Sequence, residues 1–320
     1  MKIPTYLDSK ENVIILRGNQ KINKSKFTMQ GNLISLHGSA SVFLYISDWN
    51  EEAIELNLLE NSDIKLYLII KSSKPATYEF KYILNTAAKL DVFTNIKNTE
   101  KIITSIKRVY ELEANSDLKV HNALLNMGQT NLTEYVNLNK ENANVNIDLL
   151  NIGSYNEEYN IVQDVFHNAK STISNINNSL ISNSNSKLKY SVSGRIFKGN
   201  EFSVCNQTNK GIILSEAGEI EVEPKLYIDE YNVEASHGAA IGQMDDEQLY
   251  YLLSRGLTDL QARTLIISGY TKPFINNIED EDVQLMMERQ ILKKLNEVNV
   301  LWWKILGQKT FHKSKVIMYI

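Results

Sequence analysis

Apolar and polar residues alternate strictly in several short runs through the middle of the chain. A period of two is typical of β-strands that bury one face. No stretch of ten or more residues with helical periodicity interrupts the region from about residue 90 to residue 233. The pattern therefore predicts a β-rich body, whose clearest strands lie at 144–149, 188–192 and 219–223.

Asparagine makes up roughly a fifth of residues 115–209, a region without proline. Asparagine tolerates the left-handed backbone of tight turns, and inside strands its side chain can hydrogen-bond to the next strand of a stack. Short strands without helices leave a sandwich, a barrel or a solenoid. The region contains no Asn-Gly or Asp-Gly hairpin turn and no strict repeat length. The sandwich and the β-solenoid therefore both remain open from the pattern alone.

The period changes to that of helices from Asp245 onward. Asp245 is a good N-cap, and a leucine stripe follows it until Gly256 ends the first predicted helix. Thr258 begins a second predicted helix, which we expect to end at Gly269.

A third helix is predicted after Pro273. Its acidic first turn covers residues 279–282, where negative charge is favourable. We expect its apolar face to consist of Val283, Met286, Ile291 and Leu295.

Composition and charge narrow the class of protein. The chain has 320 residues and a formal net charge of −4, and its basic residues are scattered, which argues against a nucleic-acid-binding protein. No run of about eighteen apolar residues predicts a membrane span, and no secretory signal is visible. The single cysteine, Cys205, cannot form an internal disulfide. We therefore expect a cytoplasmic protein without a membrane partner.

His237 is the most conspicuous candidate for chemistry. It follows Glu234 closely and precedes a run of small residues, so it could act as a base, bind a metal or simply be a hydrogen-bonded structural residue. No serine elbow, metalloprotease motif, cysteine-pair motif or phosphate-binding loop occurs in the chain. Cys205 lies among strand-forming residues, as a buried structural cysteine does.

The first two predicted helices also have the outline of a helix-turn-helix. However, Asp245, Asp246, Glu247 and Asp259 crowd the two helix starts, where DNA phosphates would repel them. We therefore interpret this segment as a surface for a protein partner.

One stretch of the chain matches a known family in residue type and spacing over about 35 positions. It resembles the C-terminal part of the SufB/SufD family, the scaffold subunits of iron–sulfur cluster assembly. The matching residues are Ser236-His237-Gly238-Ala239, Ile241-Gly242, Asp245-Asp246-Glu247-Gln248-Leu249, Tyr251-Leu252, Ser254-Arg255-Gly256-Leu257, Ala262, Ile266 and Gly269.

The resemblance implies a right-handed parallel β-helix followed by a C-terminal α-helical region. We accordingly expect a β-rich lead-in at 1–60, the β-helix core at 61–235 and the helical region at 236–320. The SufB branch carries a cysteine where this chain has Asn209, and an acidic residue where it has Gly238. The resemblance is therefore to the SufD-like branch, with a SufB-like or homodimeric SufBD-type subunit as the alternative.

The resemblance also implies partners and sites. It predicts a non-catalytic scaffold that pairs with a SufB-like subunit through the β-helix and with a SufC-like ABC-type ATPase through the helices, or forms a homodimer in isolation. His237 and Glu234 would bind iron or a nascent cluster transiently at the interface, without a stable cofactor. The ATPase surface would comprise Asp246, Gln248, Tyr251, Ser254, Arg255, Gly256 and Arg263. Two other classes remain as alternatives, a β-helix polysaccharide-processing enzyme and a self-associating structural solenoid.

Overall fold

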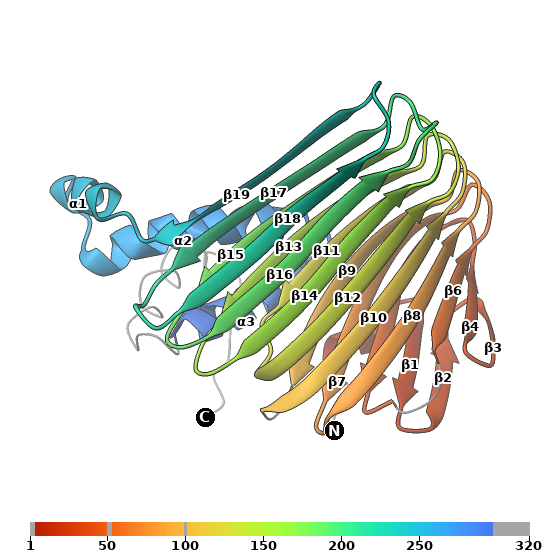
Figure 1. The fold of residues 1–320 in the computed structure, drawn as a ribbon. Coiled ribbons are helices and arrows are strands. Elements are labelled where there is room, and N and C mark those ends of the chain that lie inside the picture. Colours follow the sequence, from red (N-terminus) through yellow and green to blue (C-terminus); the bar gives the residue numbers. More distant parts are fainter. Residues whose placement is uncertain (1–3, 50–52, 99–100, 297–320) are drawn as a thin grey trace. The chain divides into compact units, whose positions relative to one another are not determined.

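The structure, a computed structural model, describes residues 4–49, 53–98 and 101–296. It divides into two compact units, Met1–Gln243 and Met244–Ile320. The first is a parallel β-solenoid of about eight turns (Figure 1). The described part of the second contains three helices, α1 (Asp246–Ser254), α2 (Asp259–Asn276) and α3 (Glu281–Asn296).

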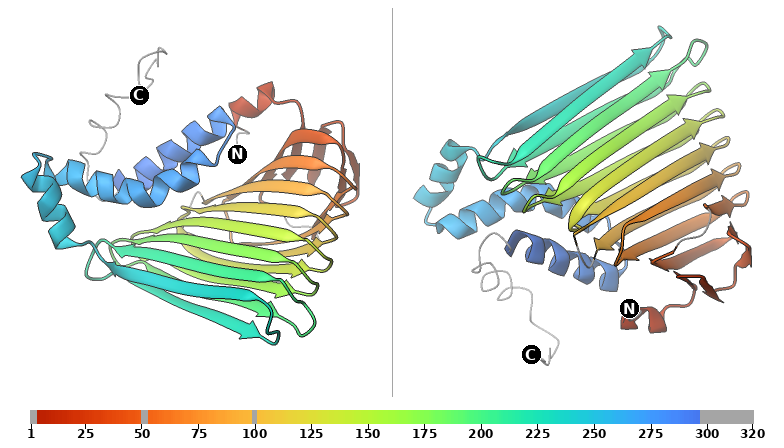
Figure 2. Two further views of the ribbon diagram at one scale, coloured as in Figure 1. Left: turned by 90° about the horizontal axis from the view of Figure 1, so that it is seen from above. Right: turned by 60° about the horizontal axis from the view of Figure 1, so that its bottom comes forward.

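The solenoid consists of two sheets, and from β4 onward successive strands alternate between them, so each rung contributes one strand to each sheet (Figure 2). The ten-stranded sheet has the order β19 (Glu234–Gln243), β17 (Val204–Ile213), β15 (Ile173–Ser182), β13 (Asn144–Gly153), β11 (Asp117–Leu124), β9 (Lys89–Asn98), β7 (Asp63–Ser72), β5 (Ser39–Ser47), β1 (Val13–Arg17) and β2 (Gln20–Lys24).

The nine-stranded sheet lies across the core from it. Its order is β18 (Glu219–Ile228), β16 (Lys187–Ile196), β14 (Glu158–His167), β12 (Gly128–Leu138), β10 (Ile102–Leu112), β8 (Ala76–Leu84), β6 (Ile54–Leu58), β4 (Leu33–Leu36) and β3 (Thr28–Gln30). A short 3₁₀ helix, η1 (Thr5–Ser9), precedes β1. The predicted parallel solenoid is confirmed, while its right-handed sense stays a prediction.

The alternation of apolar and polar residues along each strand decides which side chains fill the interior of the solenoid. In β16, for example, Leu188, Tyr190 and Val192 are buried while Lys187 and Lys189 are exposed. The inward residues of successive rungs stack in columns because the strands pair in parallel register. Apolar columns form one continuous hydrophobic core from β1 to β16. Burying these columns is the main favourable term for folding.

Asparagine ladders run between the rungs, a use of asparagine that stacked strands permit. Asn146 accepts from Asn175, which in turn accepts from Asn206, at N–O distances of 3.0 and 3.2 Å. Similar side-chain bonds join Asn160 to Asn131 and Asn168 to Asn139. These bonds satisfy polar groups that the stacking of strands partly removes from water.

The turn at one corner of each rung takes a left-handed backbone conformation. The positions with positive φ at this corner are Asn61, Ala87, Asn115, Asn142, Ser171 and Phe202. Each donates its backbone N–H to the carbonyl of the following rung's turn. Asparagine fills only half of these positions, and in the ten-stranded sheet the register of parallel strands repeats after 24 to 31 residues. These variations hide the repeat in the sequence.

The boundaries of the parts differ from those expected. Residues 13–58 do not form a separate lead-in, because β1 to β6 belong to the same two sheets as the rest of the solenoid. The helical unit begins at Met244 rather than at residue 236, because residues 234–243 pair with β17 as the last strand, β19. Residues 297–320 of the predicted helical region lie outside the described residues.

The helix starts agree with the predicted caps. The Asp245 side chain accepts from the backbone of Glu247 and Gln248, and Thr258 and Gln261 form a reciprocal capping box. Gly256 has the positive φ, 90°, of a helix C-terminus.

Two details of the helix predictions were wrong. Helix α2 continues through Gly269 and Pro273 to Asn276. Both residues are exposed, so water can satisfy the Gly269 carbonyl that Pro273 leaves without an N–H partner. In α3 the buried apolar residues are Val283, Met287, Ile291 and Leu295, so that Met287 replaces the predicted Met286.

Cys205 is buried inside the solenoid opposite a glycine of the other sheet. A Cβ on Gly194 would overlap Cys205 Sγ, so the two positions share one volume across the core. Burial raises the pKa of the Cys205 thiol, which therefore stays protonated. Cys205 is a packing residue, in agreement with its sequence context.

We expect Gly194→Ala to destabilise the solenoid by about 1–3 kcal/mol, because the added methyl overpacks the core. Adding Cys205→Ala should restore most of this loss, since the pair then fills a similar volume. Chemical denaturation of both variants and of Cys205→Ala alone tests this. Equal stability of Gly194→Ala and wild type would contradict the overlap.

His167 is completely buried at the end of β14. Its Nδ1 lies 2.8 Å from Thr172 Oγ1 and its Nε2 lies 2.9 Å from Ser174 Oγ. Desolvation lowers the pKa of His167 to about 4, so the imidazole is neutral near pH 7.

An unfolded histidine has a pKa near 6.5, so between pH 6.5 and 4 the unfolded chain binds the additional proton. The stability that neutral His167 contributes is present above pH 6.5 and is lost as the pH falls toward 4, up to roughly 3 kcal/mol. Denaturation between pH 7 and 4 should show a shallower loss for His167→Gln than for wild type. The exposed His37 provides the control, since His37→Gln should leave the wild-type slope unchanged.

Candidate functional site

The C-terminal end of the solenoid is an open mouth, formed by β18 and β19 as the last strands of the two sheets (Figure 1). Among the described residues, neither strand pairs along its outer edge. Strand β19 is exposed along its length except for the half-buried Ile241. The mouth therefore presents unpaired backbone groups together with the end of the interior.

His237 lies at this mouth on the inward side of β19. It pairs in register with Gln207 of β17, whose side chain is buried in the interior. Parallel neighbours in register point the same way, so His237 is the last member of an inward column. Gln207 Nε2 donates to the Lys225 carbonyl of β18 at 3.1 Å and thereby connects the two sheets beneath the imidazole.

Glu234, the predicted second metal ligand, faces the other way. It pairs with the outward Val204, and three residues along a strand separate opposite faces. The structure therefore does not bring Glu234 and His237 together. Within the described ranges, no group of three or more His, Cys, Asp or Glu side chains could hold a metal ion. Of the two predicted metal ligands, His237 alone lies on the inward side of β19.

Side chains of the preceding rung form hydrogen bonds with both sequence neighbours of His237, Ser236 and Gly238. Ser236 Oγ donates to Asn206 Oδ1 at 2.6 Å, at the end of an outward asparagine ladder. On the inward side, Asn209 Nδ2 donates to the Gly238 carbonyl at 3.2 Å. The side-chain amide of Asn209 is thus a hydrogen-bond donor to the last strand.

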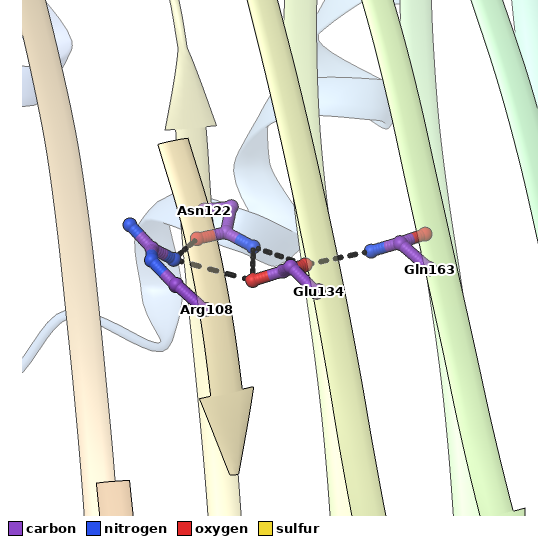
Figure 3. Close-up of polar contacts among 4 residues, drawn as sticks. All are labelled: Arg108, Asn122, Glu134 and Gln163. Carbon is purple, nitrogen blue, oxygen red and sulfur yellow. Dashed lines mark hydrogen bonds and ion pairs between the residues drawn. The ribbon is translucent and has the colours of Figure 1, made fainter. Parts of the chain in front are cut away.

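A buried polar network lies deeper in the interior (Figure 3). Arg108 Nη1 lies 3.2 Å from Glu134 Oε1 and donates to Asn122 Oδ1 at 2.7 Å. Asn122 Nδ2 donates to both carboxylate oxygens of Glu134, and Gln163 Nε2 donates to Glu134 Oε2 at 3.2 Å. Neither side chain of the ion pair is exposed. A buried charge without such partners would be strongly destabilising.

We did not identify this network from the sequence, although a signal exists. Arg108 stands between the inward Ile106 and Tyr110, and Glu134 between the inward Leu132 and Val136. Arg108 and Glu134 stand at positions that the alternation of their strands assigns to the buried face. A charged residue at such a position is predicted to point inward. The pairing of the two strands, which is needed to join them, is not visible in the sequence.

The predicted ATPase surface lies on α1 and the start of α2. Tyr251 is half exposed and Arg255 lies over its ring, 5.0 Å from the centroid. Arg263 instead forms an ion pair with Asp259 at 3.0 Å. The other predicted members are Asp246 and Gln248 in α1, Ser254 at its end and Gly256 in the turn. Sequence reasoning left out Tyr250, which is 74% exposed on the same helix.

The two sheets and the three described helices place the chain in one class of protein, the parallel β-solenoids with a helical C-terminal unit. A family model described as "SUF system FeS cluster assembly, SufBD core domain" matches residues 51–270, and the chain belongs to this family.

Curated relatives carry the same family names. The chain is 35% identical over 102 residues to the iron–sulfur cluster assembly protein SufD of Bacillus subtilis, a match that covers 32% of this chain and 23% of the relative. It is 31% identical over 90 residues to SufD of Escherichia coli, covering 28% and 20%. A SufBD family protein of Synechocystis is 38% identical over 74 residues, covering 23% and 16%. The matches thus span less than a quarter of each of these relatives.

No helix in the described part of the chain is long and apolar enough to cross a membrane.

Proposed function

We propose that this chain is a non-catalytic, SufD-like scaffold subunit of a cytoplasmic iron–sulfur cluster assembly complex. The observation that supports this best is the open mouth, which combines unpaired strand edges with the inward His237. Family membership supports the process, and the names of the relatives in Bacillus subtilis and Escherichia coli support the SufD-like branch.

The partner at the mouth is a SufB-like subunit in this proposal. Adding strands of a second solenoid to β18 and β19 satisfies their outer backbone groups and covers the end of the core. Exposed small residues along β19, such as Ala235 and Ala239, allow close approach of a partner strand. A second copy of this chain could use the same edges, which is the homodimeric alternative.

Iron or a nascent cluster is the cargo at this interface. One imidazole cannot hold a cluster, which is normally bound by several ligands and mainly by thiolates. Because Asn209 stands at the family's cysteine position, the partner would have to provide the thiolate. His237 would supply a single nitrogen ligand, and Glu234 has no part in the same coordination sphere because it faces the opposite side.

A SufC-like ATPase is the partner that we propose for the helical unit. Tyr251 and Arg255 form an exposed aromatic and cationic pair on α1, a combination that is enriched in protein interfaces. ATP-driven movement of the ATPase would then reach the mouth through the chain connection from α1 to β19.

Co-purification tests this proposal. The full chain, expressed with SufB-like and SufC-like subunits, should purify as a complex of all three. Tyr251→Ser combined with Arg255→Ser should reduce recovery of the ATPase about tenfold while the SufB-like subunit is retained, as expected for interface hot spots. Leu285→Ser, at an exposed position of α3, is the control.

Other outcomes of this purification would support other classes. Recovery of the chain only as an oligomer of itself would favour the homodimer or the structural solenoid. Cleavage of glycans by the purified chain would favour the polysaccharide-processing enzyme. Either result without the two Suf partners contradicts the proposal.

Iron binding by the reconstituted complex tests the role of His237. His237→Ala should weaken iron binding roughly tenfold or more, since a direct ligand is lost. Glu234→Ala is the matched control three residues away, and it should leave binding unchanged because that side chain faces the opposite side. Iron occupancy measured by elemental analysis would contradict the role if His237→Ala equalled wild type.

A further inference from the structure

A continuous chain of buried side chains connects the Arg108–Glu134 ion pair to the last rung. Gln163 donates to Glu134, and its Oε1 accepts from Asn178 Nδ2 at 2.9 Å. The same Asn178 nitrogen donates to Asn209 Oδ1 at 2.8 Å, and Asn209 donates to the Gly238 carbonyl. Gln163, Asn178 and Asn209 are each at most 2% exposed. We call Glu134, Gln163, Asn178, Asn209 and the Gly238 carbonyl the polar spine.

The chemistry of its two ends constrains the directions of the hydrogen bonds between them. A carboxylate at one end and a backbone carbonyl at the other can only accept hydrogen bonds. One group within the spine must therefore donate in both directions. The side-chain NH₂ group of Asn178 has two hydrogens and fills this role, which neither a hydroxyl nor a carboxylate can do.

The last rung depends on this hydrogen-bonded connection more than the inner rungs do. Among the residues that the structure describes, strand β19 is paired on one side only, and apart from Ile241 its residues are exposed, so little burial stabilises it. Terminal elements with few buried contacts open most readily. The bond from Asn209 fastens the carbonyl directly after His237 to the buried interior.

We infer that Asn178 and Asn209 are positioning residues, which hold β19 and hence His237 in place through the polar spine. This inference concerns the geometry of the mouth and not its cargo. It therefore stands or fails separately from the proposed function.

Hydrogen–deuterium exchange of the full chain, read by mass spectrometry, tests the inference. Asn178→Leu keeps a similar volume and removes both donors. Amides of residues 234–243 should then exchange about three- to tenfold faster, the change expected when a buried hydrogen bond is lost. Amides of 117–124 should stay at the wild-type rate, since β11 lies on the far side of Asn178.

Asn177→Leu is the matched control. Asn177 is the neighbouring residue on the opposite face of β15, and it donates to Asp148 of the preceding rung. This variant should leave the exchange of 234–243 unchanged. If Asn178→Leu does not fold, Asn209→Ala tests the last link and should accelerate the same amides.

Deuterium uptake at the imidazole Cε1 of His237 provides the second measurement, because it reports the histidine itself. The rate of uptake at His237 should change together with the exchange rates of the β19 amides, while the rate of uptake at His37 stays constant. The inference is overturned if His237 and residues 234–243 keep wild-type rates in Asn209→Ala. It is also overturned if Asn177→Leu accelerates β19 as much as Asn178→Leu does.

Discussion

A parallel stack satisfies the backbone of each strand through its neighbouring rungs, so the stack must be closed at its two ends. At the N-terminal end the chain turns back on itself: β1 pairs antiparallel with β2, and β3 with β4. These terminal strands are short, and Lys21 and Lys24 are exposed on β2, which discourages further pairing. No such hairpin closes the C-terminal end within the described residues. We place the proposed site there because, among the described residues, this is where the stack lacks a further strand.

Much of the fold could be predicted because it depends on local patterns. Alternation predicted strands at 144–149, 188–192 and 219–223, and each lies within a strand of the solenoid. Asn115 and Asn142 take the left-handed turns expected of asparagine. Pattern alone could not separate the solenoid from a sandwich, because turn residues such as Ala87 and Phe202 differ between rungs. The family resemblance resolved this choice.

The site was less predictable because it depends on which residues meet across rungs. His237 was identified from a local motif, but its inward direction follows from its register with Gln207. The pairing with Glu234 failed because we treated nearness in sequence as nearness in space, although the segment is a strand. Arg108 and Glu134 are 26 residues apart and meet only through the coiling of the chain. Because the number of residues per rung varies, the sequence alone does not tell that residues 26 positions apart meet on neighbouring strands.

The contrast between the two ends of the solenoid limits how far an assembly can grow. A body that accepts a neighbour at one end and refuses it at the other cannot propagate into a fibre. If two copies of this chain joined at their mouths, each would leave its lysine-bearing β1–β2 hairpin at the far end, and growth would stop at a pair. In the proposed complex the mouth would be enclosed only when two bodies meet, so that a cargo held there would be sheltered by assembly and released by separation.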